Sequence, residues 1–222
     1  MNRPRVIVFD VNQTLSDLTP LADRFGEVDA PPELAKAWFA GLLRDGIALA
    51  TTGKSAPFAD IAKAELEWVL RPVVGEEGLR YAVRHVLDGL GSLGVHPDVV
   101  DGVRALRSLD LELVTLSNGA ASVAEGLLER AGIREQFSRL LSVEDAGVWK
   151  PAAAAYEHAL SECRVTADET MLVAVHPWDI HGAASAGLRT AWLNRNGASY
   201  PAHFAAPELS PVSLVGLAAA LA

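Results

Sequence analysis

The chain has 222 residues, of which 50% are hydrophobic, so it can bury a core large enough for one sizeable domain or a domain with an insertion. Its 19 basic and 28 acidic residues give a net charge of −9 without a basic cluster, which argues against a nucleic acid partner. The single cysteine, Cys163, excludes an internal disulfide and fits a reducing compartment. No signal-peptide pattern precedes the first apolar segment, and no apolar stretch reaches the length of a membrane span. We therefore expect a cytoplasmic protein that does not associate with membranes.

Short apolar segments alternate with helical patterns along most of the chain. Strands are predicted at 5–9, 112–116, 140–143, 171–175 and 190–193. Helices are predicted at 99–109, 121–131 and 152–163, with a terminal helix at 214–221. This alternation indicates right-handed βαβ units, and hence an α/β fold whose parallel sheet lies in a three-layer, Rossmann-like core.

The region from residue 16 to residue 97 contains no segment that is typical of a buried strand. Its hydrophobic periodicity instead favours helices at 32–44, 57–70 and 79–93. We therefore predict an α/β core domain made of residues 1–15 and 98–222. Residues 16–97 are predicted to form a helical domain, inserted after the first strand, that caps the mouth of the sheet.

Polar side chains stand at or just beyond the ends of the predicted strands, where open parallel sheets place their reactive groups. Because all these loops open at one edge of the sheet, we expect two carboxylates, hydroxyl and amide groups and an ammonium to converge there. Asp10, at the end of the first strand, is the candidate nucleophile. The converging motifs, in chain order, are Asp10 with Thr14, Ser117-Asn118-Gly119, Lys150-Pro151 and Trp178-Asp179.

The order of these motifs resembles the haloacid dehalogenase (HAD) superfamily and, within it, the L-2-haloacid dehalogenase (type II) branch. The resemblance implies a HAD-like fold and a hydrolytic dehalogenase that converts (S)-2-haloacids to (R)-2-hydroxyacids with inversion. Its partner would be a small 2-halocarboxylate substrate, and the family suggests a homodimer. The matching segments are Phe9-Asp10-x-x-x-Thr14-Leu15, Leu116-Ser117-Asn118-Gly119, Lys150-Pro151 and Trp178-Asp179-x-x-Gly182-Ala183.

The resemblance also implies a role for each catalytic candidate. The Asp10 carboxylate would displace the halide and form a covalent aspartyl ester. Lys150, with the hydroxyls of Thr14 and Ser117, would keep Asp10 ionised and oriented. Asp179 would then position or deprotonate the water that attacks the ester, while Lys150 and loop amides stabilise the oxyanion.

Further contacts follow from the same resemblance. Tyr156 matches a family tyrosine that supports the site, although an aromatic side chain on this helix could also simply fill the core. Asn118 matches a residue that contacts the departing halide. The backbone amides of Val11 and Asn12, together with Ser117, would receive the substrate carboxylate.

Two positions separate this chain from phosphatases of the same superfamily. Those phosphatases carry a proton-transferring Asp two residues after the nucleophile, where this chain has Asn12. They also bind Mg²⁺ through acidic residues of the last motif, where this chain has Val175. Because a halide leaves without a proton, we expect a dehalogenase with no metal ligands and no cofactor. The alternatives left open are a phosphatase or phosphonatase-like hydrolase, and a non-catalytic binding protein of this fold.

Several positions depart from the dehalogenase pattern, among them Gln13, where relatives usually show Gly. Two further departures bear directly on the chemistry. His176 stands where relatives tend to carry Asn, and it is either a structural histidine or a catalytic one that orients or activates water. Phe39 follows Trp38 directly, at the place of a cap arginine that holds the departing halide in type II enzymes. The second departure affects the halide contact and leaves the chemistry of Asp10 untouched.

Overall fold

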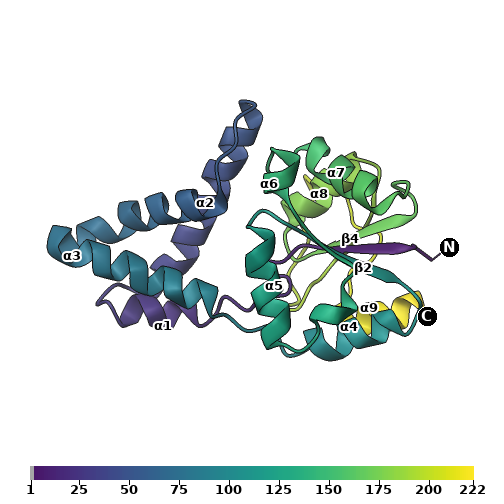
Figure 1. The fold of residues 1–222 in the computed structure, drawn as a ribbon, viewed down its shortest axis with the longest axis horizontal. Helices are drawn as coiled ribbons and strands as arrows, with labels where there is room; N and C mark the ends of the chain where they lie inside the picture. Colours follow the sequence, from purple (N-terminus) through teal and green to yellow (C-terminus); the bar gives the residue numbers. More distant parts are fainter. Residues whose placement is uncertain (1–2) are drawn as a thin grey trace. The chain divides into compact units, whose positions relative to one another are not determined.

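The structure, a computed structural model, describes residues 3–222 (Figure 1). The chain divides into two compact units, Met1–Ser16 with Gly94–Ala222, and Asp17–Leu93. We call the first the α/β unit and the second the helical unit. Among the described residues, no helix is long and apolar enough to cross a membrane.

The α/β unit is built on a five-stranded parallel sheet in the order β3-β2-β1-β4-β5. Each predicted strand is confirmed, with ends that differ from the prediction by no more than one residue. The central strand β1 pairs with β2 on one side and with β4 on the other, which places the first and fourth polar motifs side by side. The strands are β1 (Val6–Phe9), β2 (Glu112–Ser117), β3 (Arg139–Ser142), β4 (Thr170–Ala174) and β5 (Arg189–Trp192).

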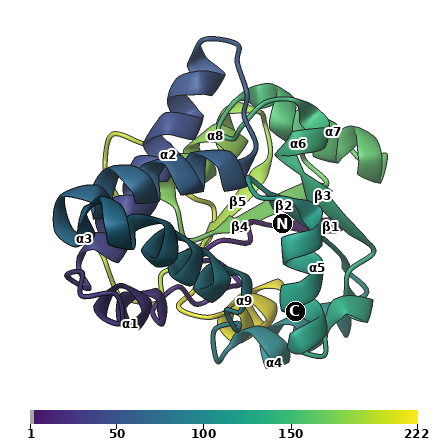
Figure 2. The same cartoon turned by 60° about the vertical axis from the view of Figure 1, so that its left-hand side comes forward.

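Helices cover both faces of this sheet, which confirms the predicted three-layer α/β fold. In both views, α4 and α9 lie on one side of the strands, and α6, α7 and α8 lie on the other (Figures 1 and 2). The helices of this unit are α4 (Val99–Arg107), α5 (Ala121–Arg130), α6 (Val143–Ala146), α7 (Ala153–Cys163), α8 (Pro177–Ser185) and α9 (Leu214–Leu221), with a 3₁₀ turn η1 (Arg134–Gln136).

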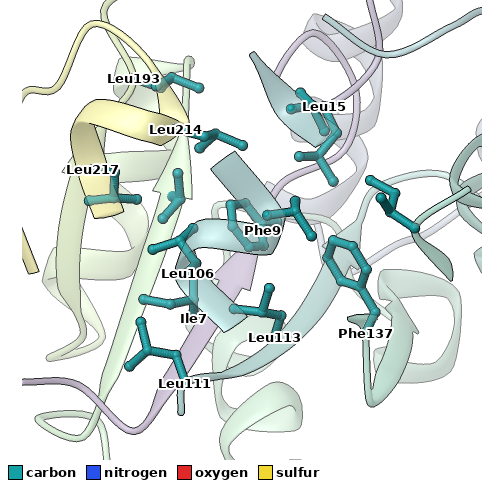
Figure 3. Packing of buried hydrophobic residues seen from close by; sticks show 14 of the residues in the cluster. Ile7, Phe9, Leu15, Leu106, Leu111, Leu113, Phe137, Leu193, Leu214 and Leu217 are labelled. Carbon is teal, nitrogen blue, oxygen red and sulfur yellow. The ribbon is translucent and has the colours of Figure 1, made fainter. Parts of the chain in front are cut away.

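One face of the sheet packs on α4, α5 and α9 through a cluster of buried apolar side chains (Figure 3). Ile7 and Phe9 of β1 point into this cluster, and Phe9 meets Phe137 edge to face at a ring-centroid distance of 5.8 Å. Val6 and Val8 are equally buried on the opposite face. Burial on both faces explains why β1 is a continuous apolar segment, and it fixes the strand that ends at the candidate nucleophile.

The helical unit contains α1 (Leu21–Gly26), α2 (Leu34–Thr51) and α3 (Phe58–Gly91). The helices predicted at 57–70 and 79–93 lie in one element, α3, which is interrupted only at Gly75 (φ 68°, ψ 176°). Helix α1 was not predicted. Trp38 is fully buried, donates from Nε1 to the Ala62 carbonyl at 2.9 Å and packs against Phe25 and Phe39, so it ties the three helices together.

The contact between α4 and α9 yields a test of the packing. A Cβ at Gly102 of α4 would overlap the Leu214 side chain and approach its carbonyl carbon to 2.9 Å. We expect Gly102→Ala to lower the free energy of unfolding by about 1–3 kcal/mol, because the backbones must separate. Gly126→Ala in α5 is the matched control, since its Cβ would meet only the flexible end of Arg130 and alanine favours a helix. Chemical denaturation measures both variants, and unchanged stability of Gly102→Ala would contradict the close contact.

Candidate active site

Asp10 follows β1 directly and is 3% exposed. Its backbone N–H donates to the Val173 carbonyl of β4 at 3.0 Å, so the residue continues the register of the sheet. The two carboxylate oxygens have different partners. Oδ1 accepts a hydrogen bond from Lys150 Nζ at 2.9 Å, and Oδ2 accepts one from Thr14 Oγ1 at 2.7 Å. Asp10 is therefore fixed at the sheet edge with one cation and one hydroxyl.

Lys150 lies between two carboxylates. Besides Asp10, its Nζ contacts Asp179 Oδ2 at 2.6 Å, and both Lys150 and Asp179 are 0% exposed. The other Asp179 oxygen accepts a hydrogen bond from the Tyr156 hydroxyl at 2.6 Å. These contacts join Asp10, Lys150, Asp179 and Tyr156 in one buried chain, which we call the ion chain.

The surrounding elements hold the ion chain in place. The backbone N–H of Lys150 donates to Asn118 Oδ1 at 3.1 Å, which ties the loop before α7 to the loop after β2. The Lys150–Pro151 peptide is cis. Gly182 of α8 faces Pro151 and Tyr156, and a Cβ at this glycine would come within 2.6 Å of the Tyr156 hydroxyl oxygen. A glycine at this position therefore allows α8 to approach α7 closely enough for the Tyr156–Asp179 bond.

The ion chain sets the charges of its members. Burial opposes ionisation of Asp10, but the Lys150 charge and the His176 contact outweigh it and hold the pKa of Asp10 below its usual value. Burial also works against the Lys150 ammonium, yet the two carboxylates raise its pKa. For Asp179, burial dominates over the attraction of Lys150, and its pKa is raised. Of the two carboxyls, Asp10 is thus the one more strongly held as an anion.

The loop after β2 places its polar groups differently from what the resemblance implies. Ser117 Oγ accepts a hydrogen bond from the Gly119 N–H at 2.9 Å and makes none to Asp10. Asn118 uses its Oδ1 for Lys150, which leaves its NH₂ group available to a ligand. The backbone N–H groups of Val11 and Asn12 have no hydrogen-bond acceptor among the described residues. These three donors can therefore receive an anion.

His176 joins the site through both of its ring nitrogens. Nδ1 lies 3.1 Å from Asp10 Oδ2, and Nε2 lies 2.9 Å from Gln13 Oε1. The ring also stacks on Trp178 at a centroid distance of 5.1 Å. Gln13 was not among the predicted site residues, and no motif marks it. Its signals in the sequence are its position three residues after the candidate nucleophile and the glycine that relatives usually carry there.

The donor set does not suit a divalent metal ion. No group of three His, Cys, Asp or Glu side chains within residues 3–222 could hold one. The Lys150 ammonium lies between Asp10 and Asp179, where a cation shared by both carboxylates would have to bind. Asn12 and Val175 also stand at the positions where the phosphatases carry acidic residues. Mg²⁺ is usually held by carboxylate oxygens, and neither Asn12 nor Val175 supplies a carboxylate.

Removing the buried cation tests the ion chain. Lys150→Met leaves Asp10 and Asp179 buried without their shared partner, so we expect the free energy of unfolding at neutral pH to fall by about 3–5 kcal/mol. In the wild type, the depressed pKa of Asp10 contributes stability above its unfolded pKa, and this contribution is lost as the pH falls. In the variant, burial raises the carboxyl pKa values, so stability should recover as the pH falls through them.

Chemical denaturation of the wild type and of Lys150→Met, from neutral to acidic pH, measures these changes in the free energy of unfolding. Lys63→Met is the matched control, because Lys63 is exposed and lies 3.9 Å from its exposed partner Glu67. The control should behave like the wild type at every pH. A Lys150→Met protein that is as stable as the wild type at neutral pH would contradict the ion chain.

Comparison with known proteins agrees with this geometry. The model of the haloacid dehalogenase-like hydrolase family matches residues 4–187. The (S)-2-haloacid dehalogenase 2 of Pseudomonas sp. (strain CBS-3) is 29% identical over 200 residues, which cover 88% of this chain and 86% of that protein. The haloacetate dehalogenase H-2 of Moraxella sp. (strain B) is 32% identical over 104 residues, but the match covers only 46% of that protein.

A solved structure shows the same similarity in three dimensions. The crystal structure of a dehalogenase with an intermediate complex superposes with a TM-score of 0.90 and 25% sequence identity. The superposition covers 98% of this chain and 96% of that chain. Together with the family match over residues 4–187, it places both the sheet and the inserted helices in a known architecture. The chain belongs to the haloacid dehalogenase-like hydrolase family.

Proposed function

We propose that this protein is a hydrolytic dehalogenase that converts short (S)-2-haloacids to (R)-2-hydroxyacids through a covalent ester on Asp10. The observation that carries the proposal is a buried Asp10 carboxylate held ionised by Lys150, with an amide at residue 12 where proton-transferring chemistry would need an acid. The (S)-2-haloacid dehalogenase relative, similar over 88% of this chain, supports the same reaction.

Ester formation needs an anionic nucleophile and a leaving group that departs without a proton. Asp10 meets the first requirement, because Lys150 and Thr14 each bind one of its carboxylate oxygens. A halide meets the second, which removes the need for a general acid next to the nucleophile. Attack on C2 from the side opposite the halogen inverts the configuration and leaves an aspartyl ester.

Ester hydrolysis needs a group that positions or deprotonates water. We assign this role to Asp179, whose raised pKa suits proton transfer better than the depressed pKa of Asp10. Tyr156 orients Asp179 by donating a hydrogen bond to Oδ1, and Lys150 occupies Oδ2. Burial first, and then the Asp179 charge, raises the pKa of Tyr156, so its hydroxyl stays a donor throughout.

The substrate carboxylate needs donors that the protein does not already use. The backbone N–H groups of Val11 and Asn12 satisfy this condition, as does the NH₂ group of Asn118. We place the substrate carboxylate at these two backbone amides and next to Ser117, the last residue of the neighbouring strand β2. The Asn118 amide then faces the departing halide.

We further propose that the inserted helical domain, residues 16–97, acts as the cap of the active site. Phe39 is 4% exposed and packs on Trp38 within this unit. An arginine at position 39 would therefore replace a buried apolar side chain. In this chain the halide contact falls to Asn118 in place of the family arginine.

A cytoplasmic location and a homodimer complete the proposal. Burial raises the pKa of the Cys163 thiol to about 11, so this single cysteine is inert and fits a reducing compartment. The homodimer rests on family resemblance.

The reaction is tested with L- and D-2-chloropropionate in metal-free buffer containing a chelator. We expect chloride release from the L isomer only, with D-lactate as the product. Asp10→Asn should reduce the rate to background, because an amide is not a nucleophile here. Chloride assays, chiral analysis of the product and the mass of the quenched peptide containing Asp10 give the readouts.

Two controls separate the alternatives. An aryl phosphate assayed with and without Mg²⁺ reports phosphatase activity, which we expect to be absent. Phe39→Arg, checked for folding by circular dichroism, tests whether the missing arginine limits the halide step. If neither the wild type nor a folded Phe39→Arg protein releases chloride or forms an ester, the dehalogenase proposal is wrong.

A further inference from the structure

The hydrogen bonds of His176 define where its protons lie. Asp10 is ionised, so its Oδ2 can only accept, and the 3.1 Å contact requires a proton on His176 Nδ1. The other nitrogen, Nε2, is engaged by Gln13 at 2.9 Å. A glutamine amide can present either its oxygen or its NH₂ group, so it satisfies Nε2 in both charge states of the ring. In either state His176 is a donor toward Asp10.

The backbone of Gln13 is fixed in a position from which its side chain contacts the His176 imidazole. Its backbone has φ 62°, a left-handed conformation that is uncommon for any residue except glycine. Both of its backbone polar atoms are anchored: the N–H donates to Ser16 Oγ at 3.2 Å, and the carbonyl oxygen contacts His96 Nε2 at 2.9 Å. A glycine would adopt this conformation without strain, but it could not reach His176. The side chain therefore accounts for the presence of glutamine at this position.

Thr14 supplies a second donor to the same oxygen. Its Oγ1 accepts a hydrogen bond from the Val175 N–H at 3.1 Å, which directs the hydroxyl proton toward Asp10 Oδ2 at 2.7 Å. Within residues 3–222, Oδ2 thus receives two directed donors, Thr14 and His176, whereas Oδ1 receives one, the Lys150 ammonium. Donors fixed before the reaction stabilise a developing oxyanion without reorganisation. Oδ2 is the carboxylate oxygen suited to carry that charge.

We propose that His176 acts as a hydrogen-bond donor and not as a base: with Thr14 it stabilises the oxyanion on Asp10 Oδ2 during ester hydrolysis, and Gln13 is its positioning residue. This inference rests on the proposed ester chemistry. It replaces Lys150 and the loop amides, which the family resemblance implies as oxyanion donors, with His176 and Thr14. Lys150 then serves the other oxygen.

The bonds and protons balance under this assignment. Oδ1 bonds to substrate C2 as the halide departs. The water oxygen then bonds to Asp10 Cγ, one proton passes to Asp179, and the electron pair of Cγ=Oδ2 moves onto Oδ2. Collapse restores Cγ=Oδ2 and breaks Cγ–Oδ1. The departing alkoxide takes a proton from Lys150, which regains one from Asp179, and the Asp10 carboxyl releases its remaining proton to solvent.

A rapid-quench experiment with L-2-chloropropionate follows formation and hydrolysis of the Asp10 ester. We expect His176→Ala to slow hydrolysis by about 10²–10³-fold, the loss typical of one oxyanion donor, so that the ester accumulates. His176→Asn should restore most of the rate, because its amide N–H can occupy the place of Nδ1–H but cannot accept a proton from water. His203→Ala, at an exposed histidine, is the matched control and should hydrolyse the ester at the wild-type rate.

Gln13 is tested by the same step. Gln13→Leu should slow ester hydrolysis more than ester formation, and Gln13→Glu should restore it because a carboxylate can still accept from Nε2. ¹⁵N NMR of the free enzyme gives a readout that is independent of turnover. We expect His176 Nδ1 to carry a proton at neutral pH, and Gln13→Leu to broaden or shift that signal while the other histidine signals stay in place.

The possible results separate the two proposals. If the wild type forms no ester from the haloacid, the proposed function fails. If the ester forms but His176→Ala hydrolyses it at the wild-type rate, or His176→Asn is as slow as His176→Ala, the donor role is wrong. An unprotonated Nδ1 in the NMR spectrum overturns the donor role whatever the substrate.

Discussion

The contact on which this site depends is a single buried ammonium between two buried carboxylates. Neither Asp10 nor Asp179 could remain charged at its depth in the protein without Lys150, and Lys150 could not remain charged without them. Three ionised groups are therefore stable only as a set. The set still carries one more negative charge than positive charge, which is the condition a nucleophilic carboxylate requires. The further donors at Thr14, Tyr156 and His176 compensate for that excess.

The fold supplies these groups from separate segments that meet at one edge of the sheet. Because β1 pairs with β4, the loop that carries Asp10 lies next to the first turn of α8, which carries Asp179, although the two residues are 169 positions apart in the sequence. Asn118 and Gly182 then set the approach of the loop before α7 and of helix α8. The apolar cluster beneath β1 holds the strand that ends at Asp10. Strand β1 therefore both packs the core and fixes the position of the nucleophile.

The sequence was sufficient for the parts that follow from local pattern. The strands were predictable because apolar segments end at polar residues, and parallel topology then predicts that Asp10, Lys150 and Asp179 meet. The break in α3 was predictable, because Gly75 falls in the gap between the two predicted helices. The helical turn that contains Pro72 was not predictable, since proline usually ends a helix. The partner of Ser117 was also missed, because a hydroxyl can accept from its own turn as readily as donate to a distant carboxylate. Gln13 carries no motif at all, and its role depends on a contact with residue 176.

Residues outside the sequence motifs, such as Gln13, help to give the two carboxylate oxygens of Asp10 different roles in the reaction. A carboxylate in water has two equivalent oxygens, and either could attack. Here Lys150 binds Oδ1, while Thr14 and His176 bind Oδ2. Oδ1, next to Lys150, forms the ester bond, and its bond to Cγ must later break to release an alkoxide. Oδ2, which faces Thr14 and His176, must carry the negative charge of the tetrahedral intermediate before that bond breaks. A strained glutamine at residue 13 is a reasonable cost for that difference, because without a fixed His176 the second oxygen would have Thr14 as its only directed donor.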